Sequence, residues 1–247
     1  MTKATLESTL NTVFDTFGKD CISAVYLTGS RLNNLFTAES DYDLYVVLKQ
    51  SKENLVFGVY ESGQLTGEHD FKYMESYKFL QLIFKSNPNM TEMFTRSPLY
   101  VSEEFAELAS YLYAHSEDLA YINPRRYFSG GYHLLKNNYN KLKNGSGKVA
   151  KARAGKEVAN FYKTYYQLKA LANKENFKDT VFLTGERREF LFNLKNVATF
   201  TDEEQIELLK DMENKLTELL LIKESFTDVD MNKEVVRTLI NLLPEGV

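Results

Sequence analysis

The chain has 247 residues, a formal net charge of −4, and apolar and charged fractions of 43% and 26%, which are typical of a soluble globular protein with one large or two modest domains. No apolar run approaches the roughly 20 residues that cross a bilayer, and the N-terminus lacks the apolar core of a signal peptide, so we expect a cytoplasmic protein without a membrane partner. The single cysteine excludes an internal disulfide and a cysteine-rich zinc site.

The first hundred residues mix helix and strand patterns. Apolar residues fall on one face of a helix between Leu6 and Phe17, and Gly18 follows as a C-cap. Residues rich in β-branched and aromatic side chains then predict strands. In chain order we expect strands over 22–28, 44–48, 57–60 and 69–74, and a helix over 77–85.

After about Ser97 the strand patterns nearly vanish. Helical periodicity covers 103–115, 126–143, 148–173, 187–194, 202–224 and 233–243. We therefore predict an α+β protein, in which a small mixed β-sheet with flanking helices (residues 1–97) is followed by an all-helical domain (residues 98–247).

Positive charge is concentrated in the helical part. Between Arg125 and Lys174 there are 12 Lys and Arg residues and one acid, Glu157, a balance of +11, whereas the rest of the chain sums to −15. Such a segment indicates either a face that meets phosphate or a solvated, lysine-rich helix pair. We expect a basic face on the helical domain.

Three acidic residues lie at the starts of two predicted strands. Asp41 and Asp43 precede the strand over 44–48, and Asp70 lies in the strand over 69–74. Side chains two apart on an extended chain project to the same side, and close carboxylates repel each other unless cations lie between them. Magnesium prefers oxygen ligands, and two such ions can clamp the oxygens of a phosphoryl displacement. The pattern is typical of a two-metal site acting on a triphosphate.

A glycine-serine turn ends the strand before these acids. Gly29 would let the backbone approach a phosphate, Ser30 can donate its hydroxyl, and Arg31 can pair with phosphate through its planar guanidinium. The glycine-serine turn alone, or the Asp-x-Asp motif alone, is also typical of a surface turn. Their order and spacing together favour the phosphate interpretation, and they disfavour two other Asp-x-Asp chemistries. An aspartyl-phosphate phosphatase carries its pair after an apolar strand, and a calcium loop needs further oxygen ligands.

The segment from Gly29 to Leu44 resembles the DNA polymerase β-type nucleotidyltransferase superfamily. Within it, the chain is similar to the predicted nucleotidyltransferases that include the RNA-repair-ligase-associated polymerase-β-like proteins. Looser similarities extend over most of the chain: residues 69–75, 78–92, 156–169 and 186–191. Where family members often carry a histidine and an arginine, this sequence has Asn160 and Lys163.

This resemblance implies Asp41 and Asp43 as ligands to two Mg²⁺ ions, with Mn²⁺ as a substitute, and Asp70 as a ligand to one of them. It further implies Ser30 and Arg31 on the triphosphate and release of pyrophosphate. Lys156 and Lys163 share one face of a helix, from which they would reach phosphates or simply face water.

Two further residues are predicted to share a strand face with the aspartates. Tyr45 follows Asp43 on the same strand face and is the best aromatic candidate to touch a nucleotide. Lys72 shares the face of Asp70, where it would contact a phosphate or partly neutralise the carboxylates, or lie at the surface.

The leading hypothesis is an enzyme that transfers NMP from an NTP to a hydroxyl of an RNA such as tRNA, of a protein or of a small molecule. The alternatives are a non-catalytic nucleotide- or RNA-binding protein on the same fold, and a toxin or effector nucleotidyltransferase. The base of the NTP, the acceptor and the oligomeric state are not readable from the sequence.

Overall fold

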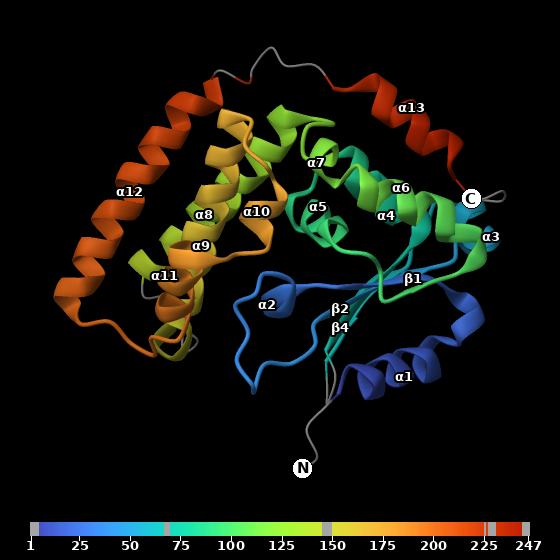
Figure 1. The fold of residues 1–247 in the computed structure, drawn as a ribbon, viewed down its shortest axis with the longest axis horizontal. Coiled ribbons are helices and arrows are strands. Elements are labelled where there is room, and N and C mark those ends of the chain that lie inside the picture. The colour runs from blue at the N-terminus through green and yellow to red at the C-terminus, as the bar shows by residue number, and fades with distance from the viewer. Residues whose placement is uncertain (1–4, 67–69, 145–149, 225, 227–230, 244–247) are drawn as a thin grey trace. The chain divides into compact units, whose positions relative to one another are not determined.

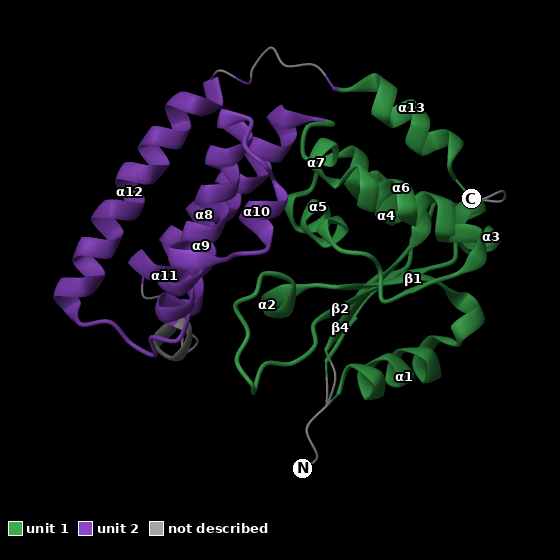
Figure 2. Ribbon diagram, in the orientation of Figure 1, with its two compact units in different colours: residues 1–122, 232–247 green, residues 123–231 purple. Residues whose placement is uncertain are grey.

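The computed structural model describes residues 5–66, 70–144, 150–224, 226 and 231–243, without the side chains of 150–153. The chain forms two compact units, residues 1–122 with 232–247, and residues 123–231 (Figure 2). The loss of strand patterns predicts a domain boundary after residue 97. The structure keeps the following helices in the first unit, because they bury apolar side chains such as Leu108, Leu112 and Leu119.

The first unit is built on a five-stranded mixed sheet with the order β3-β4-β2-β1-β5. Strand β2 runs antiparallel to β1 and parallel to β4, and the two edge strands β3 and β5 are antiparallel to their neighbours. The strands are β1 (Ile22–Leu27), β2 (Leu44–Leu48), β3 (Ser62–Leu65), β4 (Phe71–Glu75) and β5 (Tyr100–Val101). With the helical second unit, this sheet confirms the predicted α+β class.

Helices cover both faces of the sheet (Figure 1). On one face, α1 (Leu6–Phe17) places Val13 in an apolar cluster with central strand residues that include Val25 and Val46. On the other face, Tyr26 of β1 contacts the rings of Phe79 and Phe94. These two aromatic residues come from α4 (Ser76–Phe84) and from the 3₁₀ helix η2 (Glu92–Thr95). The central strands are therefore buried on both sides, which fixes their register.

The remaining elements of this unit are short. Besides the 3₁₀ helices η1 (Lys19–Cys21) and η3 (Glu103–Phe105), they are α2 (Gly29–Leu32), α3 (Lys52–Phe57), α5 (Pro88–Thr91), α6 (Ala106–Ala114), α7 (Ser116–Leu119) and the closing helix α13 (Lys233–Asn241).

The predicted strand over 57–60 is wrong. The chain there forms α3 and its C-terminal turn instead, because Ser51 caps the first turn by accepting a hydrogen bond from the Asn54 amide. Gly58 then ends the helix in the left-handed conformation, with φ 65°. The edge strand that pairs with the other side of β4 is β3 (Ser62–Leu65), whose exposed residues give no strand pattern.

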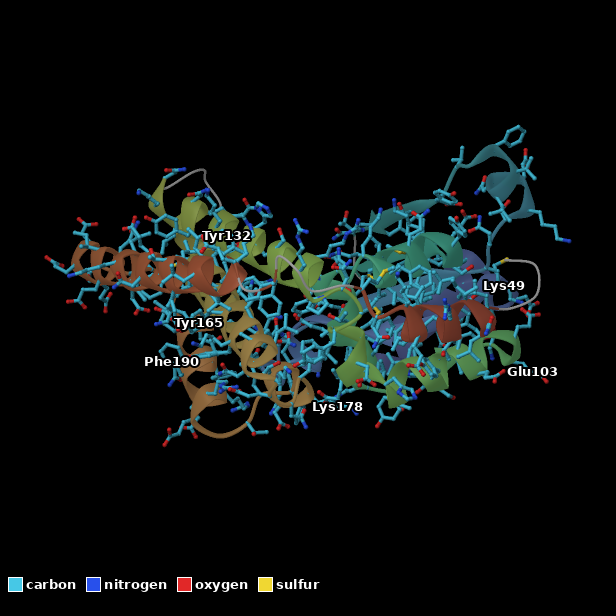
Figure 3. The ribbon with its side chains drawn as sticks, turned by 90° about the horizontal axis from the view of Figure 1, so that it is seen from above. Lys49, Glu103, Tyr132, Tyr165, Lys178 and Phe190 are labelled. Carbon is cyan, nitrogen blue, oxygen red and sulfur yellow. The ribbon has the colours of Figure 1, made fainter. Side chains whose placement is uncertain are left out.

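The second unit consists of helices among its described residues: α8 (Pro124–Lys143), α9 (Ala150–Asn173), α10 (Lys178–Val181), α11 (Gly185–Lys195) and α12 (Asp202–Glu224). Helix α9 buries Val158, Phe161 and Leu168. Polar contacts join α9 to α12: the Tyr165 hydroxyl, labelled in Figure 3, donates to Glu218 Oε2 at 2.6 Å. None of the described helices is long and apolar enough to span a bilayer.

A glycine sets how closely α9 approaches the end of α11. A Cβ on Gly155 would lie 2.2 Å from the carbonyl oxygen of Leu194 and 2.4 Å from that of Val197. Because backbone cannot move aside as a side-chain end can, we expect Gly155→Ala to lower the free energy of unfolding by about 3 kcal/mol. Denaturant unfolding measures the free energy of unfolding. Gly131→Ala is the control, and we expect it to lose less stability than Gly155→Ala. There the new methyl would meet the end of the Leu168 side chain, so a larger loss for Gly131→Ala would contradict the account.

Candidate active site

The strand register brings two of the predicted acids to neighbouring positions. Strands β2 and β4 are parallel and adjacent, and Leu44 pairs with Phe71. Asp43 and Asp70 are the residues directly before this pair, and both are exposed. Neighbouring strands lie about 4.8 Å apart, so the two aspartates occupy adjacent positions at the N-terminal ends of β2 and β4. Residues 27 places apart in the sequence thus meet at one end of two strands.

The alternation of side chains places Asp41 with Asp43. Tyr42, between them, is partly buried and packs against the apolar cluster under α1. Because successive side chains of an extended segment point to opposite sides, the two aspartates project away from that cluster. Asp41 is exposed, as Asp43 is.

Gly29 lies directly against the Asp43 carboxylate. A Cβ built on Gly29 would stand 2.0 Å from Asp43 Oδ2 and 2.7 Å from Cγ, and Gly29 has a φ of +66°. Two independent reasons therefore require glycine: the left-handed backbone conformation and the space that the carboxylate fills. Thr28 reinforces the junction, since its amide and its hydroxyl both donate to the Asp43 carbonyl oxygen, at 2.9 and 3.1 Å.

Arg31 contacts the segment that carries the first aspartate. Its Nη2 donates to the Ser40 carbonyl oxygen at 2.7 Å and its Nε to the Asp41 carbonyl oxygen at 3.2 Å. The guanidinium also lies over the ring of Tyr42, 3.8 Å from the centroid. The family resemblance implies that Arg31 contacts the triphosphate, whereas in the structure its guanidinium donates to backbone carbonyl oxygens of the protein.

The expectation that Tyr45 touches a nucleotide is wrong. Its side chain is only 9% exposed, and its hydroxyl donates to Met74 Sδ at 3.2 Å in the interior. Burial raises the pKa of this hydroxyl to about 12. Tyr45 lies on the same strand face as Asp43, as the alternation of side chains predicts. That face is exposed at Asp43 but is covered at Tyr45. Lys72 pairs in register with Tyr45 and is exposed.

Sequence reasoning gave no role to Glu92, which is only 8% exposed. Its Oε2 accepts a hydrogen bond at 3.3 Å from Asn33 Nδ2, at the end of α2. This contact joins α2, and hence the glycine-serine turn, to the helices on one face of the sheet. An acidic residue next to the apolar pair Met93 and Phe94 is the signal that identifies it.

Comparison with known families decides what this unit is. Residues 8–112 match the family model described as "Nucleotidyltransferase domain", a range that contains the turn and all three acids. This part of the chain is therefore similar to nucleotidyltransferase domains of the polymerase β type. The match extends past residue 97 into α6, as the first structural unit does.

Other comparisons add little to the nucleotidyltransferase match. No curated protein matches the sequence. Among solved structures, a nucleotidyltransferase-like protein from Exiguobacterium sibiricum 255-15 aligns over 95% of this chain and 80% of its own, at 12% identity and a TM-score of 0.37. A similarity at this level supports neither a shared activity nor a shared substrate.

Nucleotidyltransferase domains generally use divalent metals, and the acids offer the oxygen donors that Mg²⁺ prefers. In the part of the chain that the structure describes, no three His, Cys, Asp or Glu side chains converge into a ready metal site. The backbone nevertheless places Asp43 beside Asp70, with Asp41 two residues away. These residues fit divalent ions if a side-chain rotation brings the carboxylates together.

Lys156 and Lys163 belong to the second unit, on α9. Lys156 is exposed and Lys163 is half-buried. Their assignment to nucleotide binding stays a prediction.

Proposed function

We propose that this protein is a Mg²⁺-dependent nucleotidyltransferase that transfers NMP from an NTP to a hydroxyl acceptor, with Mn²⁺ as a substitute ion. The observation that carries the proposal is the adjacent placement of Asp43 and Asp70, each directly before the first paired residue of two parallel strands, with Gly29 packed against the Asp43 carboxylate. The match of residues 8–112 to the nucleotidyltransferase domain supports the reaction class.

The reaction exchanges the α,β-phosphoanhydride bond of the NTP for a phosphate ester bond to the acceptor. The acceptor oxygen forms a bond to the α-phosphorus of the NTP, the bond from that phosphorus to the bridging oxygen breaks, and pyrophosphate leaves. The divalent ions, when bound, supply charge neutralisation for the triphosphate and the leaving group. Asp41 and Asp43 would hold both ions, and Asp70 would hold one of them and help to take the proton of the attacking hydroxyl. Ser30, next to Gly29 at the start of α2, would donate its hydroxyl to a phosphate oxygen.

Labelling with nucleotides tests this proposal. Each of the four α-³²P-NTPs is incubated with the protein, Mg²⁺, and total RNA or total protein as the acceptor. We expect label to enter an acceptor with one NTP preferred, and no label with Asp41→Ala/Asp43→Ala. Absence of transfer and of pyrophosphate with every NTP and acceptor would overturn the proposed function.

We further propose RNA, for example a tRNA 3′ end, as the acceptor, because the +11 segment between Arg125 and Lys174 forms most of α8 and α9. Lysines on these helices such as Lys136, Lys141 and Lys156 are exposed. Lys141 is partly neutralised, since its Nζ lies 3.2 Å from Glu157 Oε2.

Binding to RNA should therefore depend steeply on salt. Neutralising several phosphates releases as many counterions, so we expect the association constant to fall by at least about tenfold between 50 and 200 mM KCl. Fluorescence anisotropy with a labelled tRNA measures it, and Lys136→Gln/Lys156→Gln should flatten the slope. An association constant that does not change with salt would point to a protein or small-molecule acceptor.

A second candidate function is a non-catalytic nucleotide-binding protein. It is favoured by the lack of a converged carboxylate cluster among the described residues. The labelling experiment separates the two, because a binder retains NTP on the protein without releasing pyrophosphate.

A further inference from the structure

The segment between α2 and β2 carries Asp41 but has no helix or strand of its own. It contains a turn in which the Thr37 amide donates to Ser40 Oγ at 2.9 Å and the Ser40 amide to the Thr37 carbonyl oxygen at 3.1 Å. Beyond this turn, the backbone carbonyls of Ser40 and Asp41 are held by a side chain rather than by a strand ladder. That side chain is Arg31.

Three features of Arg31 act together on this segment. Two nitrogens of one planar guanidinium donate to consecutive carbonyl oxygens, at 2.7 and 3.2 Å. The flat face of the group covers the Tyr42 ring at 3.8 Å and lies 5.0 Å from the Phe36 centroid. Tyr42 in turn packs against the apolar cluster under α1. The guanidinium therefore ties the Asp41 backbone to α2 and, through Tyr42, to the core of the sheet.

We propose that Arg31 is a positioning residue, which fixes the backbone of residues 40–43 so that the carboxylates of Asp41 and Asp43 stand where the metal ions bind. This inference rests on the proposed function. It differs from the expectation that Arg31 binds the triphosphate, because here Arg31 acts on the protein in the absence of substrate. A lysine cannot replace it, since an ammonium group offers neither two parallel donors nor a flat face for the ring.

The test compares Arg31→Lys and Arg31→Ala with the wild-type protein, and uses Arg237→Lys, exposed on α13 of the same unit, as the matched control. Hydrogen exchange of the amides of residues 37–43 is measured on the protein without nucleotide. Steady-state kinetics then give kcat, KM for the NTP, and the Mg²⁺ concentration at half-maximal rate.

We expect amide exchange in residues 37–43 to become at least tenfold faster in both Arg31 variants. A displacement of about 1 Å at the reacting groups lowers the rate of the chemical step about 10²-fold, so we expect kcat to fall by about that factor. KM for the NTP should change less than about threefold. The Mg²⁺ concentration at half-maximal rate should rise, and Arg237→Lys should behave as wild type.

A rise in KM for the NTP of tenfold or more, with exchange and Mg²⁺ dependence unchanged, would show that Arg31 binds the triphosphate and overturn the inference. Unchanged values of all parameters in Arg31→Ala would also overturn it. If the wild-type protein transfers no nucleotide, the proposed function fails separately. The exchange measurement still decides whether Arg31 holds the segment, since it needs no activity.

Discussion

Replacing Asp43 with asparagine is expected to lower kcat for nucleotidyl transfer by about 10³-fold or more, which corresponds to about 4 kcal/mol in the barrier. Asparagine has the shape of aspartate, so it still fits against Gly29, but it lacks the charge that would hold divalent ions beside the triphosphate. Removing one of several neighbouring carboxylates also relieves repulsion, so the thermal midpoint should stay the same or rise. Steady-state kinetics and thermal denaturation of the purified variant measure both effects.

The matched control for this substitution is Asp15→Asn, which makes the same chemical change at an exposed position of α1. We expect it to keep wild-type kcat and stability. An Asp43→Asn protein that retains more than about a tenth of the wild-type kcat would contradict the role given to Asp43.

Gly29→Ala is expected to lower kcat by about 10²-fold and to leave the fold intact. The new methyl group would stand 2.0 Å from Asp43 Oδ2, so the carboxylate must rotate away from the position that the ions require. The left-handed φ of +66° adds about 1 kcal/mol of strain, which should lower the thermal midpoint by a few degrees. Kinetics and thermal denaturation again measure the two effects separately.

The chain offers a close control for the strain. Gly58 has a φ of +65°, and a Cβ there would meet nothing within 4 Å. Gly58→Ala should therefore show the effect of strain alone: it should lose less stability than Gly29→Ala, whose Cβ would also lie 2.9 Å from Asp43 Cβ, and it should keep its activity. Equal losses of activity in the two variants would show that backbone strain, and not the collision with Asp43, explains the effect.

The sequence predicts those parts of the fold in which one local pattern dominates. The strand over 44–48 and the helix over 202–224 agree with β2 and α12, because a continuous apolar run and a capped helical period are unambiguous. The edge strands β3 and β5 were not predicted. Their conformation comes from pairing with a neighbouring strand, and their own residues are exposed or half-buried.

The same contrast applies to the site. Chain order and residue type point to Gly29, Asp41, Asp43 and Asp70. Burial and hydrogen-bond partners depend on packing between distant segments, which no local pattern encodes. Tyr45 is therefore in the interior, and the Arg31 guanidinium donates to backbone carbonyl oxygens.

The most direct test of the account counts metal ions. Electron paramagnetic resonance follows a titration of Mn²⁺ into the protein with a non-hydrolysable NTP, and the ions bound by the nucleotide alone are subtracted. We predict two ions bound per chain in the wild-type complex, one in Asp70→Asn, and none held by the protein in Asp41→Asn/Asp43→Asn. The same number of bound ions in all three proteins would contradict the claim that these carboxylates form one metal site.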